Sequence, residues 1–252
     1  MSEFLKNILD LDFTNTEILI DQNHDSNDVL EILKNKISAQ DFKPENKYYL
    51  TFKDNKLSIL FQNQKPIYVD FLSPSLKKIF GQISKNDIFC KAIGLKDEVS
   101  CVYDLTAGFG SDTFVLSKFV NEIVWVERNS VMCLLLNDGL RRLEEKYSEL
   151  SCKFKIIYKD GLDFINENNF EINSTIYFDF MFENKKSKSN KEMSFLKHIT
   201  KNDSLNDVSI YINRALKKSK NRVVLKTKIL EEKNLKPKHI YKGKTVQYFV
   251  FK

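Results

Sequence analysis

Short apolar runs alternate with longer amphipathic stretches from about residue 97 to the C-terminal end of the sequence. The runs have the length of buried strands and are rich in Val, Ile, Phe and Tyr; they lie at 102–104, 123–126, 154–158, 174–178 and 223–226. After the first run, the apolar residues of 114–119 suit one buried face of a helix. Strands and helices that alternate in this way predict an α/β fold with a mostly parallel, doubly wound sheet.

Acidic residues stand where these strands are expected to end. They are, in chain order, Asp104, Glu127, Asp160 (with Gly161 after it) and Asp179. Because the ligand crevice of an open parallel sheet lies beyond the carboxyl ends of its strands, four such positions predict one polar cleft. A single acid there can simply cap the next helix, which is the interpretation we favour for Asp112 or Asp160 taken alone.

Gly108 and Gly110 form a G-x-G pair shortly after Asp104, where the chain is expected to turn from strand to helix. A side chain at either position would obstruct the turn and the close approach of the backbone to a ligand, which indicates a nucleotide-like cofactor. The spacing alone fits an ordinary tight turn equally well. Glu127 adds weight to the cofactor, since an acid at the end of the second strand can accept hydrogen bonds from both ribose hydroxyls.

Residues 1–96 read as a small α+β appendage, and residues 97–252 as the main domain. The appendage is predicted to hold a helix near 27–37, a hairpin of 48–52 with 57–61, an extended segment at 67–71 and helices up to Gly94. The main domain closes with a hairpin of 238–241 and 245–251 around a Lys-Gly-Lys turn. A terminal antiparallel hairpin after a parallel half is the sheet plan of Class I (Rossmann-like) methyltransferases, which have seven strands.

The formal net charge of +6 is unevenly distributed. Residues 185–252 hold nineteen Lys and Arg against five Asp and Glu, so this part carries about +14 and the rest about −8. Such an excess suits a polyanionic partner, although a solvated lysine-rich surface has the same composition. Four lysines follow Asp179 closely, where the phosphates of a bound nucleic acid are expected: Lys185, Lys186, Lys188 and Lys191.

Neither cysteine nor histidine spacing indicates a metal site. The four cysteines are scattered without a C-x-x-C pair, which favours reduced, buried thiols, and the three histidines are isolated. No apolar run approaches the length of a membrane span, so we expect a cytoplasmic protein without a membrane partner. The sequence leaves the oligomeric state open.

From about residue 67 to residue 252 the chain resembles the RsmJ family. The resemblance rests on D-L-T-A-G-F-G-S-D-T-F-V-L at 104–116, V-E-R-N-S-V at 126–131, L-L-N-D-G-L at 135–140, Y-F-D-F-M-F at 177–182 and K-E-M at 191–193. Members use S-adenosyl-L-methionine to methylate the exocyclic N2 of a guanosine near the 3′ end of 16S ribosomal RNA. The resemblance therefore implies this reaction, with ribosomal RNA or the small ribosomal subunit as partner.

The resemblance also implies cofactor-binding positions. Gly108 and Gly110 would let the backbone pass the methionine part, and Glu127 would hold the ribose with Arg128 beside the adenine. The full set that it implies is Asp104, Gly108, Gly110, Ser111, Asp112, Glu127, Arg128, Asp160, Gly161 and Asp179. Ser111 replaces the usual arginine of the family at that place.

For catalysis, the Asp179 carboxylate and the Phe180 carbonyl can orient a guanine amino group and accept its hydrogen bonds. Phe182 can stack on an extruded base, while core packing is the alternative for both phenylalanine rings. The chain reads D-F-M-F-E at 179–183 where the family has D-P-M-F-P, so a more flexible loop is expected. The family's G-G-G-R-G-E segment is also replaced, by residues 81–87.

Two alternative functions stay open. One is a methyltransferase for another RNA or protein acceptor, and the other is a non-catalytic RNA-binding assembly protein.

Overall fold

The computed structural model describes residues 11, 18–20, 33, 48–61, 65–180, 205–228 and 235–251. The strands of these parts are β1 (Ile18–Ile20), β2 (Tyr48–Lys53), β3 (Lys56–Phe61), β4 (Cys101–Asp104), β5 (Glu122–Glu127), β6 (Lys153–Tyr158), β7 (Ser174–Phe178), β8 (Arg222–Lys228), β9 (His239–Lys242) and β10 (Val246–Phe251). The helices are α3 (Pro74–Gln82), α4 (Ile88–Ile93), α5 (Ser111–Phe114), α6 (Ser130–Lys146), α7 (Gly161–Glu167) and α9 (Leu205–Lys218), with a 3-10 turn η1 (Val115–Lys118).

Seven strands form the main sheet in the order β6-β5-β4-β7-β8-β10-β9. The neighbours from β6 to β8 pair in parallel, and β10 pairs antiparallel with both β8 and β9. The sequence-based prediction of a mostly parallel sheet of seven strands with a terminal antiparallel hairpin is therefore confirmed. The strand order reverses beside β4, which places a ligand crevice at the carboxyl ends of β4, β5 and β7.

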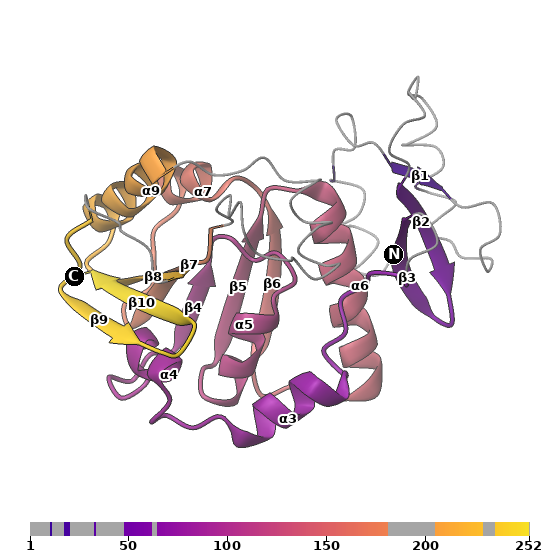
Figure 1. Cartoon of the computed structure of the whole chain (residues 1–252), viewed down its shortest axis with the longest axis horizontal. Helices are drawn as coiled ribbons and strands as arrows, with labels where there is room; N and C mark the ends of the chain where they lie inside the picture. The colour runs from indigo at the N-terminus through magenta and orange to yellow at the C-terminus, as the bar shows by residue number, and fades with distance from the viewer. Residues whose placement is uncertain are drawn as a thin grey trace.

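Successive residues of the sheet strands belong to two separate cores. Val102 and Trp125 pack on one face with α4, α5 and α6, whereas Tyr103 and Val126 pack on the other with α7 and α9. This alternation is the period of two that a strand buried on both faces requires. Figure 1 shows α7 and α9 side by side over one face and α6 beside β6.

The hairpin predicted near residues 48–61 is confirmed as β2 and β3, which pair antiparallel with Lys53 opposite Lys56. Asp54 and Asn55 both have positive φ, at 53° and 58°, as a two-residue type I′ turn requires. The extended segment expected at 67–71 forms only an isolated bridge between Ile59 and Ile67, because no further strand pairs with it among the described residues. Of the helix expected near 27–37, only Leu33 is described, and it is helical.

The helix whose apolar face was expected among residues 114–119 is α-helical only in its first turn. Its α-helical part ends at Phe114, and the next four residues tighten into η1, where the N–H of Phe119 donates to the carbonyl of Leu116. The chain has to reach β5 at Glu122, which leaves room for little more than two turns. The buried face itself is as expected, since Phe114, Val115 and Leu116 are all in the core.

A buried ion pair on α6 joins the N-terminal hairpin to the main sheet. Asp138 Oδ2 accepts from the backbone N–H of Leu57 at 3.1 Å and from Arg142 Nε at 2.9 Å. Arg142 in turn donates to the carbonyl of Val69 and, at 3.5 Å, to Asp70. In Figure 1 the small sheet of β1, β2 and β3 lies beside α6, where these contacts fix it. The division into two domains at residue 96 stays a prediction.

The expected state of the cysteines is confirmed, because Cys90, Cys101, Cys133 and Cys152 are all free and buried. Desolvation raises the pKa of the Cys90 thiol to about 11, which keeps it protonated and unreactive at neutral pH. Among the described residues, no helix has the length and apolar character needed to cross a membrane.

Candidate active site

A cleft of roughly 730 Å³ opens at the carboxyl ends of the parallel strands. It brings together all the predicted cofactor residues, which are Asp104, Gly108, Gly110, Ser111, Asp112, Glu127, Arg128, Asp160, Gly161 and Asp179, and it also includes Phe180. Phe182 and the four lysines at 185, 186, 188 and 191 lie outside the described residues. The expectation that strand-end acids meet in one cleft therefore agrees with the structure, while the task of each residue stays a prediction.

The two glycines of the G-x-G pair differ in what surrounds them. Both have positive φ, 52° at Gly108 and 67° at Gly110. A Cβ on Gly110 would lie 2.9 Å from Leu136 and 3.0 Å from Trp125, whereas a Cβ on Gly108 would meet nothing closer than the Thr106 carbonyl at 3.9 Å. Gly110 is thus required by the fold, and Gly108 leaves open space beside the backbone in the cleft.

We expect Gly110→Ala and Gly108→Ala to separate folding from cofactor binding. Both alanines are strained by positive φ, but only Gly110→Ala also overpacks the core, so it should lose about 2–4 kcal/mol of unfolding free energy against about 1 for Gly108→Ala. Gly108→Ala should instead weaken cofactor binding at least tenfold, because its methyl group fills the space beside the loop. Urea unfolding and calorimetric titration with S-adenosyl-L-methionine measure the two effects. Wild-type cofactor affinity in Gly108→Ala would contradict the close approach.

Asp104 organises the glycine loop from inside the protein. Its carboxylate is 2% exposed and accepts from the N–H of Thr106 at 3.2 Å and from the hydroxyl of Thr113 at 2.7 Å. The Thr113 hydroxyl accepts in turn from Trp125 Nε1 at 2.8 Å. Desolvation raises the pKa of Asp104 to about 7, although both hydrogen bonds oppose the rise. These contacts assign Asp104 to the scaffold of the loop, and a direct contact with a cofactor stays a prediction.

Glu127 links the glycine loop to the start of α6. One carboxylate oxygen accepts from the N–H of Gly108 at 2.8 Å, and the other accepts from the N–H of Asn129 at 2.8 Å. Burial raises the pKa of this carboxyl, and the two backbone donors oppose the shift. A carboxylate offers about four acceptor sites, so beyond its backbone donors Glu127 can still accept from a ribose hydroxyl.

Asp160 caps α7, as the alternative interpretation of this residue expected. Its Oδ1 accepts from the N–H of Leu162 at 2.8 Å, and both oxygens accept from the Tyr211 hydroxyl at 2.7 Å. The guanidinium of Arg128 lies 4.0 Å away across the cleft. Asp160 therefore caps α7 and holds Tyr211 of α9 at the cleft, and its proposed contact with adenine stays a prediction.

A lysine that sequence reasoning missed connects two of the predicted residues. Lys226 Nζ donates to Asp179 Oδ2 at 2.9 Å and to Asp112 Oδ2. Tyr177 donates its hydroxyl to the same Asp112 oxygen at 3.1 Å, and the N–H of Asp179 donates to the Thr106 hydroxyl at 2.6 Å. The residue after β7 is thereby bonded to both the glycine loop and β8.

The Phe180 ring belongs to the core. It is 6% exposed, stacks on Phe178 with centroids 5.3 Å apart and meets Tyr211 edge-on at 5.2 Å. Packing, the alternative for this side chain, is therefore what the structure shows, while its carbonyl remains a predicted hydrogen-bond acceptor. Burial of the ring also fixes the first residue of the loop, where the resembled family has a proline.

One wall of the cleft comes from the segment that precedes the main sheet, which sequence reasoning left without a task. The residues concerned are Pro66, Tyr68, Val69, Asp70, Ser73, Ser75, Leu76 and Ile79. Ile79 is 52% exposed, so this wall offers apolar as well as polar surface. Little in the sequence indicated this wall, because α3 is short and the residues that line the cleft share no chemical type.

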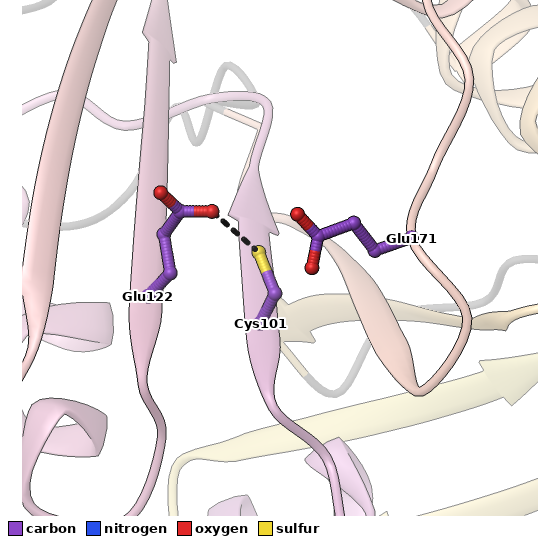
Figure 2. Close-up of side chains that lie close together, drawn as sticks. All are labelled: Cys101, Glu122 and Glu171. Atoms are coloured by element: carbon purple, nitrogen blue, oxygen red, sulfur yellow. Dashed lines mark hydrogen bonds between the residues drawn. The ribbon is translucent and has the colours of Figure 1, made fainter.

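Three potential metal ligands meet at the other end of the sheet. Figure 2 shows Cys101 and Glu122 on neighbouring strands, with Glu171 opposite them. Their ligand atoms lie within 4.8 Å of one another, but Cys101 Sγ already donates to Glu122 and the ammonium of Lys155 balances Glu122 at 2.7 Å. Desolvation raises the pKa of the Cys101 thiol to about 12. The cluster is accounted for as a hydrogen-bonded buried thiol, away from the cleft.

The strand order, the single antiparallel strand and the cleft with its glycine loop define a Class I methyltransferase. Residues 32–252 match the family model described as "Putative SAM-dependent methyltransferase". The chain belongs to this family, and its cofactor is S-adenosyl-L-methionine. The open space beside Gly108 and the remaining acceptor capacity of the Glu127 carboxylate fit that cofactor.

Individual relatives agree with this assignment. The Ribosomal RNA small subunit methyltransferase J of Coxiella burnetii is 33% identical over 195 residues, 74% of each chain. Its counterpart in Alteromonas mediterranea is 33% identical over 192 residues, 73% of each chain. The crystal structure of a SAM-dependent methyltransferase from Neisseria gonorrhoeae covers 94% of this chain and 95% of its own, with a TM-score of 0.67 and 21% identity, and supports the fold alone.

Proposed function

We propose that this protein methylates the exocyclic N2 of a guanosine near the 3′ end of 16S ribosomal RNA, acting in the cytoplasm on the RNA or the small ribosomal subunit. The observation that carries the proposal is the position of Asp179, whose carboxylate lines the same cleft as Gly108 and Glu127. The names of the relatives that are 33% identical over nearly three quarters of the chain support ribosomal RNA as the substrate.

The chemistry requires orientation more than acid-base strength. A guanine amino group is a poor nucleophile because its lone pair is delocalised into the ring, and hydrogen-bond acceptors on its N–H groups restore lone-pair character. The Asp179 carboxylate and the Phe180 carbonyl supply two such acceptors beside the cleft. When bound, the cofactor supplies an electrophilic methyl group. The S–CH3 bond would break as the N–C bond forms, leaving a neutral thioether, and the amino nitrogen would lose a proton that the Asp179 carboxylate would accept and pass to water.

Charge and surface support a nucleic acid as the acceptor. The last quarter of the chain carries about +14, and Lys228 of β8 lines the cleft. The N-terminal wall with Tyr68 and Ile79 provides surface for an unpaired base and its neighbours. The lysines at 185, 186, 188 and 191 are proposed to contact phosphates of the same RNA.

Methyl transfer to purified small-subunit particles tests the proposal. Particles from cells that lack the protein should take up label from radiolabelled S-adenosyl-L-methionine, and nuclease digestion should recover it as N2-methylguanosine. Particles from cells that contain the protein are the matched control and should take up almost none. Label in another nucleoside or in ribosomal protein would overturn the proposed acceptor. Particle binding without label would indicate a non-catalytic assembly protein.

A further inference from the structure

Lys226 occupies an unusual electrostatic position in the cleft. It extends from β8 so that its ammonium lies between Asp112, in α5 directly after the glycine loop, and Asp179, the residue that follows β7. Its side chain is only 20% exposed, while the two carboxylates are 44% and 37% exposed. A lysine in such a setting loses hydration that these contacts must replace. The two ion pairs of Lys226 are therefore expected to contribute more free energy than an exposed surface ion pair does.

One ammonium serves two carboxylates. Titratable groups that interact electrostatically with Asp179 include Asp104 from β4, Asp112 from α5, Tyr177 from β7, Lys226 from β8 and Tyr248 from β10. All of them except Lys226 are acids, so each one that ionises disfavours a charged Asp179. Lys226 is the cation of this set, and its contact with Asp179 favours the carboxylate form.

We propose that Lys226 is a positioning residue for methyl transfer: its ammonium holds the Asp179 carboxylate toward the acceptor and ties it, through Asp112, to α5 at the end of the glycine loop. The proposal rests on the function proposed above, since Asp179 is the group that meets the acceptor. It assigns to Lys226 no proton transfer of its own. The shared ammonium adds a second link between these two parts of the cleft, beside the hydrogen bond from the Asp179 N–H to the Thr106 hydroxyl.

Protonation states agree with this geometry. Contacts with Asp179 and Asp112 raise the pKa of Lys226 despite its desolvation, so it remains an ammonium and cannot act as a base. Desolvation raises the pKa of Asp179 to about 6, with Lys226 opposing the rise and Asp112 adding to it. Asp179 is therefore mostly ionised at neutral pH, and its charge is lost as pH falls through about 6. Without Lys226, the Asp179 carboxylate should lose its charge at a higher pH.

The pKa of Asp179 can be measured without any RNA, which keeps this test separate from that of the proposed function. Carbon-13 NMR titration of labelled Asp carboxyls, with the Asp179 signal assigned from Asp179→Asn, should show that Lys226→Met raises the pKa by at least about one unit. Lys228→Met is the matched control, because it removes the same charge two residues along the same strand. Its shift should be much smaller. An unchanged Asp179 pKa in Lys226→Met would overturn the proposal.

Turnover gives a second readout. The acid limb of the kcat profile should move up in Lys226→Met by the same interval as the carboxyl pKa, so that activity lost at pH 7 returns near pH 9, with KM for the particles changed less than threefold. Lys226→Arg keeps the cation and should restore most of the wild-type profile. Equal loss of kcat at every pH, with no rescue by arginine, would mean that Lys226 has only a structural role. A further outcome is that neither the wild-type protein nor any variant transfers methyl groups to the particles while Lys226→Met still shifts the Asp179 pKa. That result would refute the proposed acceptor and leave the effect of Lys226 on Asp179 standing.

Discussion

Asp179→Asn is expected to lower kcat for methyl transfer by two to four orders of magnitude and to change cofactor affinity less than tenfold. The amide keeps the size of the side chain but cannot take up the proton that the acceptor nitrogen loses, and removing a general base of this kind typically costs 10²–10⁴. It also presents a neutral group to Lys226, which loses the ion pair at 2.9 Å. Single-turnover methyl transfer with small-subunit particles and calorimetry with S-adenosyl-L-methionine measure the two quantities.

Asp163→Asn is the matched control for this prediction. It makes the same chemical change at an exposed position in the first turn of α7 that does not line the cleft. Its kcat should stay within twofold of wild type. A rate for Asp179→Asn within tenfold of wild type would show that the carboxylate is dispensable. The base would then have to be oriented by backbone groups such as the carbonyl of Phe180.

Much of the fold and of the cleft could be predicted, because both follow from local patterns of apolar and polar residues in the sequence. The strands of the parallel sheet are buried on both faces and read as nearly continuous apolar runs, and the topology then places their polar ends together. The same rule would have found Lys226, which follows Val223-Val224-Leu225 as Asp104 follows its own run. It was missed because only acids were considered at strand ends, and because one lysine is inconspicuous in the lysine-rich last quarter of the chain.

Other features depend on contacts that no local pattern contains. Asp138 lies in a motif that identifies the family, yet its task, to hold the backbone of Leu57, follows from a contact across 81 positions of sequence. The wall formed by Tyr68 and Ile79 likewise becomes visible only when the segment before the sheet is packed beside the cleft. Tertiary packing decides such contacts, so the sequence could show that the residues matter but not how.

The loop after β7 illustrates how a sequence departure can be compensated by packing. The missing proline at position 180 predicted a more flexible start of this loop, because proline restricts φ. Phe180 restricts the same residue differently, since its ring is held between Phe178 and Tyr211. Tyr211 also donates to Asp160, so the packing that holds Phe180 is continuous with the cap of α7. The first residue of the loop is therefore anchored without proline.

The second large effect is expected for stability. Asp138→Ala should lower the free energy of unfolding by about 3–5 kcal/mol, because it leaves the buried Arg142 guanidinium without its principal counter-ion. The Leu57 N–H also loses its acceptor. Urea unfolding at pH 7, monitored by the fluorescence of Trp125, measures the change. Because Arg142 also holds the carbonyl of Val69, which lines the cleft, a folded fraction of the variant should bind the acceptor more weakly.

Glu145→Ala separates this effect from the loss of any carboxylate on α6. Glu145 also pairs with Arg141, at 2.6 Å, but its side chain is 52% exposed, so its removal should cost no more than about 1 kcal/mol. The contrast between the two variants follows from burial, since Asp138 is 1% exposed and its partner Arg142 only 7%. Equal costs for the two substitutions would show that the hairpin is held chiefly by its apolar contacts with α6. The ion pair would then specify the orientation of the hairpin rather than its stability.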